Sequence, residues 1–160
     1  MRQFDKFYWI GFFFVKLGVF INMNFFTTQF SLSPSLFTIL IIIVSLVFYQ
    51  SLSISVSAAR DKYKIKAPAT TGNENFERAY RTHLNFMENL VIFLPLVLIA
   101  GIKFDTSFWY IGACALWLIG KIVFSIAYSK GFSDKLKIGA NVVSLVGVLT
   151  LFALAVLVLF

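Results

Sequence analysis

The stretch FERAYRTHLNFMENLVIFLPLVLIAGI, residues 76–102, has all its arginines, carboxylates, histidine and asparagines in its first half. Its second half holds only apolar residues, glycine and one proline. A helix needs about 20 residues to cross a hydrocarbon layer about 30 Å thick. The stretch therefore predicts a membrane-spanning helix, whose polar half either anchors it at the water line or lines a polar site in the membrane.

The rest of the chain is also apolar. Of its 160 residues, 59% are hydrophobic and 13% are charged, and the mean hydropathy is +0.86. A soluble domain of this composition could not cover its surface with polar side chains, so we expect an integral protein of the lipid bilayer. Lysine and arginine total 14 against 7 for aspartate and glutamate. This excess fits loop topology better than nucleic-acid binding, because no basic cluster has base-stacking spacing.

Four apolar runs are long enough to span the bilayer. They cover approximately residues 36–59, 76–102, 108–128 and 136–160. They predict an all-α fold, an integral membrane four-helix bundle over residues 31–160, with Ser33 as the cap and Pro34 as the first residue of the first helix. Residues 1–30 are expected to be a short apolar N-terminal extension, interfacial or partly inserted, on which no part of the function is based.

The links between these runs differ in charge. The first and third, residues 59–75 and 129–137, are rich in lysine, whereas residues 101–107 hold one lysine and one aspartate. Cytoplasmic loops carry an excess of lysine and arginine, so the first and third loops are predicted to be cytoplasmic. Trp109 and Tyr110 then fall at the outer interface, where we expect ordinary aromatic-belt residues.

The polar residues of the opening stretch share one face of the predicted helix. Within an arc of about 100° lie Arg78, Arg81, Asn85, Glu88 and Asn89. Asn85 and Glu88 are too short to reach the water line, and an ionised carboxylate in the membrane is costly unless it is paired. An Arg81–Glu88 pair that only locks helices together is one interpretation. A ligand site is favoured, because the stripe has more donors and acceptors than a lock needs.

A second polar face is predicted on the third helix, where Lys121, Phe124 and Tyr128 emerge on one side near the cytoplasmic end. Arginines bind carboxylates through two hydrogen bonds, and a carboxylate such as Glu88 holds an ammonium. A nearby lysine or arginine also lowers the pKa of a thiol. These groups suit a small zwitterion with carboxylates, an ammonium and a thiol. Glutathione has them, although the stripe alone does not identify it.

The stretch APATTGNENFERAYRTHLNFMENL, residues 67–90, followed by FLPLVLIAGI, resembles the membrane-associated proteins in eicosanoid and glutathione metabolism, the MAPEG family. This group contains microsomal glutathione S-transferases, leukotriene-C synthase and lipoxygenase-activating protein. The resemblance runs from about residue 58 to the end of the fourth helix. It implies a homotrimer of four-helix subunits, with glutathione bound between adjacent subunits near the cytoplasmic face.

Carried over position by position, the resemblance implies a set of glutathione contacts. They are Arg60, Arg81, His83, Asn85, Glu88 and Tyr128. His83 stands where the synthase has a glutamine that faces the neighbouring subunit. Phe124 and Asn89 each replace a tyrosine, so the ligand is expected to be held differently there. Asp61 replaces an arginine that the synthase uses for its lipid substrate, which argues against that lipid chemistry.

The thiol-activating arginine of the family, at the start of the fourth helix, has no arginine counterpart. Counting from Tyr128 gives Lys135, whereas matching the apolar residues that follow gives Lys137. Lysine keeps the charge but lacks the planar fork of arginine, so we expect thiolate stabilisation to be weaker or aimed differently.

Together, these inferences predict a membrane-bound glutathione transferase, or a glutathione-dependent peroxidase, acting in detoxification. Its partners would be glutathione as co-substrate and a hydrophobic electrophile or lipid hydroperoxide from the bilayer. No metal site is predicted, because cysteine and histidine do not cluster with ligand spacing, and the single Cys114 is expected to be a small buried side chain. The alternatives are a non-catalytic lipid-binding or scaffold protein of the lipoxygenase-activating type, and a structural membrane protein whose stripe is only a helix-packing network.

Overall fold

Four helices make up the part of the chain that the computed structural model describes, residues 35–160. They are α3 (Leu36–Lys62), α4 (Glu74–Phe104), α5 (Phe108–Ser129) and α6 (Asp134–Leu157). All four are long and apolar enough to cross a membrane, so the predicted all-α, integral membrane four-helix fold is confirmed. The expected N-terminal extension and the expected cap at Ser33 and Pro34 lie outside the described residues.

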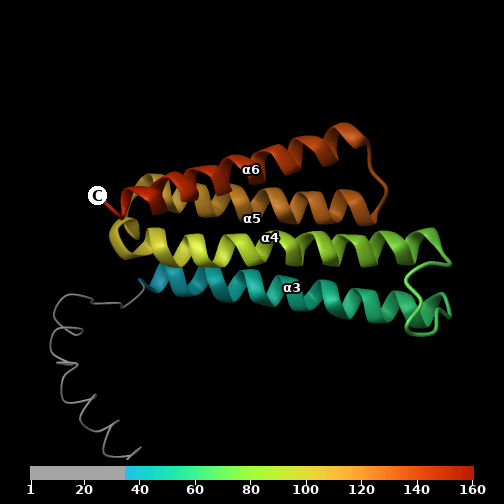
Figure 1. Ribbon diagram of the computed structural model, residues 1–160. Coiled ribbons are helices and arrows are strands. Elements are labelled where there is room, and N and C mark those ends of the chain that lie inside the picture. Colours follow the sequence, from blue (N-terminus) through green and yellow to red (C-terminus); the bar gives the residue numbers. More distant parts are fainter. Residues whose placement is uncertain (1–34) are drawn as a thin grey trace, which may run out of the picture. The chain divides into compact units, whose positions relative to one another are not determined.

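The helices lie side by side in chain order, and each packs against the next (Figure 1). α4 also contacts α6. Figure 1 shows the link between α3 and α4 and the link between α5 and α6 at one end of the bundle, and the C-terminus at the other. We call the end with residues 63–73 and 130–133 the basic end, because the lysine-rich links lie there.

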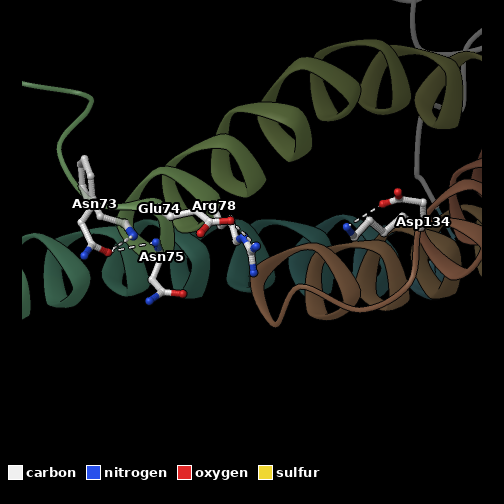
Figure 2. A network of polar contacts seen from close by, with 7 residues as sticks. Asn73, Glu74, Asn75, Arg78 and Asp134 are labelled. Carbon is white, nitrogen blue, oxygen red and sulfur yellow. Dashed lines mark hydrogen bonds and ion pairs between the residues drawn. The ribbon is translucent and has the colours of Figure 1, made fainter.

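Side chains cap α3 and α4 at positions that hydropathy does not show. The Ser35 hydroxyl accepts a hydrogen bond from the Thr38 backbone N–H at 3.2 Å, so α3 begins one residue later. Asn73 accepts from the backbone N–H of Asn75 at 3.0 Å and starts α4 two residues before the predicted Phe76 (Figure 2). α4 is therefore 31 residues long, and its first turns extend beyond its apolar part.

Most of the core residues come from α4, α5 and α6, and α3 adds Ile41. Trp117 is the largest of the fully buried side chains. The Trp117 ring stacks on Phe93 with 3.6 Å between the ring centroids. Cys114 is buried as well, which confirms its expected place in the core. Many large apolar side chains face outward instead, as a lipid-facing surface requires.

α5 and α6 approach closely through small residues. A Cβ on Gly120 would lie 2.7 Å from the backbone N of Ser144 and 2.8 Å from the carbonyl oxygen of Ala140. Small residues at such contacts let the backbones of membrane helices pack directly against each other. This contact sets the register between α5 and α6 close to the polar residues of the basic end.

Tyr110 is not an interfacial belt residue, so that expectation is wrong. Its side chain is fully buried, and its hydroxyl donates to the carbonyl oxygen of Val97 at 3.1 Å. The same hydroxyl hydrogen-bonds the Thr38 hydroxyl at 2.8 Å, so Tyr110 joins α3, α4 and α5. Three buried polar groups satisfy one another here, which explains why the tyrosine faces inward. Its neighbour Trp109 is 68% exposed, as expected for a belt residue.

Candidate functional site

The two faces predicted on α4 and α5 meet in the half of the bundle that contains the basic end. Arg81 and Asn85, one turn apart on α4, face Phe124 and Tyr128, one turn apart on α5, across a cavity of about 280 Å³. Residues four positions apart lie on the same side of a helix, so each helix contributes one wall. The structure thus brings together four of the residues singled out in the sequence.

Arg81 and Glu88 form an ion pair within α4, with 3.8 Å between Nη1 and Oε1. The two side chains are 57% and 53% exposed in the single chain. An exposed pair at this separation contributes little to stability and leaves most donors and acceptors free. Because both residues belong to α4, the pair does not lock two helices of the chain together. This geometry speaks against the packing interpretation of the stripe.

Asn85 and Asn89 differ in how they are satisfied. The Asn89 side-chain amide donates to the backbone oxygen of Asn85 at 2.7 Å. The side-chain oxygen of Asn85 is buried and has no hydrogen-bond partner among residues 35–160. A buried acceptor without a partner is unfavourable, so Asn85 offers a site for a donor from a ligand, water or second subunit.

His83 lies away from the cavity lining. Its ring stacks on Tyr49 of α3, with 4.9 Å between centroids and an interplanar angle of 21°. Both ring nitrogens are buried and unpartnered within the described part of the chain. A role for His83 in ligand binding therefore requires groups that this single chain does not bring to it.

Arg60 supports the loop between α3 and α4. Its Nη1 donates to the carbonyl oxygen of Ala69 at 2.8 Å and, at 3.4 Å, to that of Ile65. Its guanidinium also lies over the Phe76 ring, 4.8 Å from the centroid. Arg60 is therefore not part of the cavity formed by its own chain. This contact to the loop could not be predicted from the sequence, because its partners are backbone carbonyls.

Arg78 belongs to the polar stripe but serves the ends of the helices. It forms an ion pair with Glu74, and Figure 2 shows the two side chains together at the start of α4. Its guanidinium also lies against Gly131, which has a positive φ of 68° in the link between α5 and α6. One turn further on, the Thr82 hydroxyl lies 3.2 Å from that of Ser129. These contacts fix α4 to the end of α5.

The two candidate lysines occupy different surroundings. The Lys137 ammonium lies 5.5 Å from the centroid of the Tyr128 ring and forms an ion pair with Asp134 at 3.0 Å. Figure 2 labels Asp134 and marks this ion pair with a dashed line. Tyr128 in turn stacks on Phe124, with 5.6 Å between centroids. Lys135 instead lines a separate, mostly apolar hollow between α5 and α6, with Gly120 and Val143 among its neighbours. Of these two lysines, Lys137 is therefore the one next to the cavity wall.

Lys121 is a polar residue whose surroundings the sequence did not reveal. Its side chain is almost completely buried, at 1% exposure, and its Nζ donates to the side-chain oxygen of Asn141 on α6 at 3.0 Å. The ammonium also lies 5.6 Å from the centroid of the Phe124 ring. The signal in the sequence was a lysine and an asparagine, each inside an otherwise apolar run.

Comparison with known proteins identifies the family. The sequence profile of the MAPEG family matches residues 38–160. The chain belongs to the MAPEG family. The match covers all four described helices except the first two residues of α3, so the resemblance inferred from the stretch of residues 67–90 is confirmed.

Individual MAPEG relatives match over shorter stretches. A Synechocystis protein described as uncharacterized protein sll1147 is 40% identical over 89 residues, which are 56% of this chain and 64% of that protein. Bovine leukotriene C4 synthase is 33% identical over 81 residues, 51% of each chain. Human microsomal glutathione S-transferase 2 is 30% identical over 86 residues, 52% of this chain and 56% of the transferase. The matched stretch thus spans about half to two thirds of these relatives.

Proposed function

We propose that this MAPEG protein is a membrane-bound glutathione transferase that joins the glutathione thiolate to hydrophobic electrophiles from the bilayer. The observation that carries the proposal is the cavity in which Arg81 and Asn85 of α4 face Tyr128 of α5. Relatives named as a glutathione S-transferase and a leukotriene synthase support the same class of chemistry. The basic end would face the cytoplasm, by the positive-inside rule.

The cavity residues complement the groups of glutathione. The Arg81 guanidinium would bind a carboxylate through two hydrogen bonds, and Glu88, two turns away on the same helix, would hold the ammonium. The unpartnered oxygen of Asn85 would accept a peptide N–H. Tyr128 supplies a hydroxyl that the neighbouring Phe124 lacks. Asn89, already bonded to the Asn85 backbone, would support the helix face on which the ligand lies.

The proposed assembly is a homotrimer with glutathione held between adjacent subunits. The exposure of Arg81 and Glu88 in the single chain supports it, because charged groups on a membrane-spanning helix require a polar partner. Arg60 and His83 do not line the cavity of their own chain. Arg60 and His83 would therefore bind glutathione at the cavity of a neighbouring subunit.

Lys137 is the better candidate for stabilising the thiolate, since its ammonium lies over the Tyr128 ring, whereas Lys135 lines the apolar hollow. A nearby cation favours the thiolate over the thiol. The thiolate sulfur would attack an electrophilic carbon, form the C–S bond and displace the leaving group with its bonding electrons.

A peroxidase reaction would use the same thiolate. Its sulfur would attack the terminal oxygen of a lipid hydroperoxide and break the O–O bond, and the lipid alkoxide would take up a proton. A second glutathione would then reduce the resulting sulfenic acid, giving glutathione disulfide and water.

A second candidate function is a non-catalytic lipid-binding or scaffold role. The observation in its favour is that the first turn of α6 carries lysines and no arginine, and that Lys137 is already paired with Asp134. Such a protein could bind glutathione without activating it.

The test is a glutathione titration of the protein purified in detergent, following the ultraviolet absorbance of the thiolate, with later addition of a generic aromatic electrophile. Binding, thiolate formation and turnover together would support the transferase. Binding without turnover would favour the scaffold role, and no binding would contradict both. S-methyl glutathione, which cannot form a thiolate, is the control for the absorbance signal.

A further inference from the structure

Lys121 carries a positive charge into the interior of the bundle. Its Nζ has one hydrogen bond, to the side-chain oxygen of Asn141, and an ammonium has three donors. No carboxylate of residues 35–160 lies within ion-pair distance of it. A buried charge in a membrane protein is costly, and an apolar side chain of similar length could fill the same space. The lysine therefore calls for an explanation beyond packing.

The position of Lys121 relative to the cavity supplies one. Its ammonium lies 5.6 Å from the centroid of the Phe124 ring, and the Phe124 ring stacks on Tyr128. Phe124 and Tyr128 form the α5 wall of the cavity that Arg81 and Asn85 complete. The almost completely buried ammonium thus lies next to a side chain that lines the cavity, in surroundings from which water is largely excluded. A charge acts over a longer range there than it does in water.

The other charged groups near this level are already engaged or lie farther along. On α6 they are Asp134, Lys135 and Lys137, all in the first turn, and Asp134 pairs with Lys137. On α4 they are Arg81 and Glu88, which pair with each other. On α5 itself Tyr128 is the titratable neighbour, and its ring stacks on the same Phe124 ring that the Lys121 ammonium approaches.

We propose that Lys121 is a positioning residue of this site: held by Asn141 of α6, its buried positive charge acts across Phe124 to favour an anionic ligand group, the thiolate, in the cavity. The proposal rests on the proposed binding of glutathione. It differs from the role of Lys137, which lies over Tyr128 at the basic end of the same wall. Gly120, next to Lys121, keeps α5 close enough to α6 for the hydrogen bond to Asn141.

The test measures the pH midpoint of thiolate formation by glutathione bound to the full-length protein. Lys121→Gln keeps a donor toward Asn141 but removes the charge, and we expect its midpoint to lie about one pH unit above that of the unmodified protein. Lys121→Arg keeps the charge and should restore most of the shift. Asn141→Asp places a negative charge beside the ammonium and should raise the midpoint in the same direction.

The outcomes separate the two proposals. If the unmodified protein binds no glutathione, the proposed function fails and this inference fails with it. If it forms the thiolate and the folded Lys121→Gln and Asn141→Asp variants keep its midpoint, only the role of Lys121 is overturned. If neither variant folds, the Lys121–Asn141 contact is a packing lock, which also overturns the proposal. A raised midpoint in both variants, largely recovered in Lys121→Arg, is the supporting result.

Discussion

The charged groups of Arg81 and Glu88 meet at 3.8 Å on one face of α4, and both side chains remain more than half exposed in the single chain. A structural ion pair in a membrane protein would be expected to lie inside the bundle and to join different helices. This pair does neither, and the adjacent cavity is lined by Arg81 itself. The two charged groups are therefore accessible to a ligand or a second subunit, as the proposed function requires.

Replacing either member of this pair should weaken glutathione binding without changing the assembly. Arg81→Ala would remove the proposed bidentate, charge-assisted contact to a carboxylate, and Glu88→Ala would remove the proposed acceptor for the ammonium. We expect each to weaken binding by about 10- to 100-fold, measured by calorimetric titration in detergent. The elution volume on size exclusion should not change; a shift to smaller species would favour the packing interpretation.

The matched control is Arg78→Ala. Arg78 lies on the same stripe, but it contacts Glu74 and Gly131 at the end of the helices and does not line the cavity. Its loss should lower thermal stability slightly and leave glutathione affinity within about twofold. Equal losses of affinity in Arg78→Ala and Arg81→Ala would show that general positive charge, and not the cavity, attracts the ligand.

The two lysines at the start of α6 should be separable by substitution with methionine, which keeps the length of the side chain but removes the charge. Lys137→Met should lower kcat with an aromatic electrophile by about tenfold or more, because it removes the cation beside Tyr128. Lys135→Met should leave kcat within about twofold, since Lys135 lines the apolar hollow. The reverse order of effects would assign the thiolate to Lys135.

Hydropathy was sufficient to predict the four helices. In lipid, a run of about 20 apolar residues satisfies its backbone hydrogen bonds by forming a helix. Hydropathy did not show where α4 begins, because Glu74 and Asn75 are polar and the start depends on the side-chain cap of Asn73. It also could not distinguish Tyr110 from Trp109. The two are neighbours in an apolar run, and the tyrosine faces inward because its hydroxyl finds partners on two other helices, the Thr38 hydroxyl and the Val97 carbonyl.

Helical periodicity predicted that Arg81 and Asn85 share one face of α4. It also predicted that Phe124 and Tyr128 share one face of α5, and these two faces line the cavity. Periodicity within one helix cannot give the register between two helices. The Lys121–Asn141 contact depends on that register, which the close approach at Gly120 sets. The family resemblance placed Arg60 at the position of a ligand contact. It could not show that the Arg60 guanidinium donates a hydrogen bond to a loop carbonyl of its own chain.

The close approach of α5 and α6 can be tested with two glycines of the same helix. In Gly120→Ala the new Cβ would lie 2.7 Å from the Ser144 backbone N, which cannot move away without shifting α6. We expect a loss of about 1–3 kcal/mol, seen as a lower unfolding temperature in detergent. Gly112→Ala is the control, because a Cβ there meets nothing within 4 Å. Similar stability losses in the two variants would contradict the packing described.

The hydroxyl of Tyr110 should matter for stability and not for glutathione. Tyr110→Phe leaves the buried carbonyl of Val97 and the hydroxyl of Thr38 without this partner, which should cost about 1–3 kcal/mol. Thr38→Val removes the other side of the same contact, so the double variant should lose less than the sum of the two single losses. Because Tyr110 lies near the first turn of α5, far along the helix from Tyr128, glutathione affinity should be unchanged in all three variants. A weakened affinity at full folding would show that the two ends of the bundle are coupled.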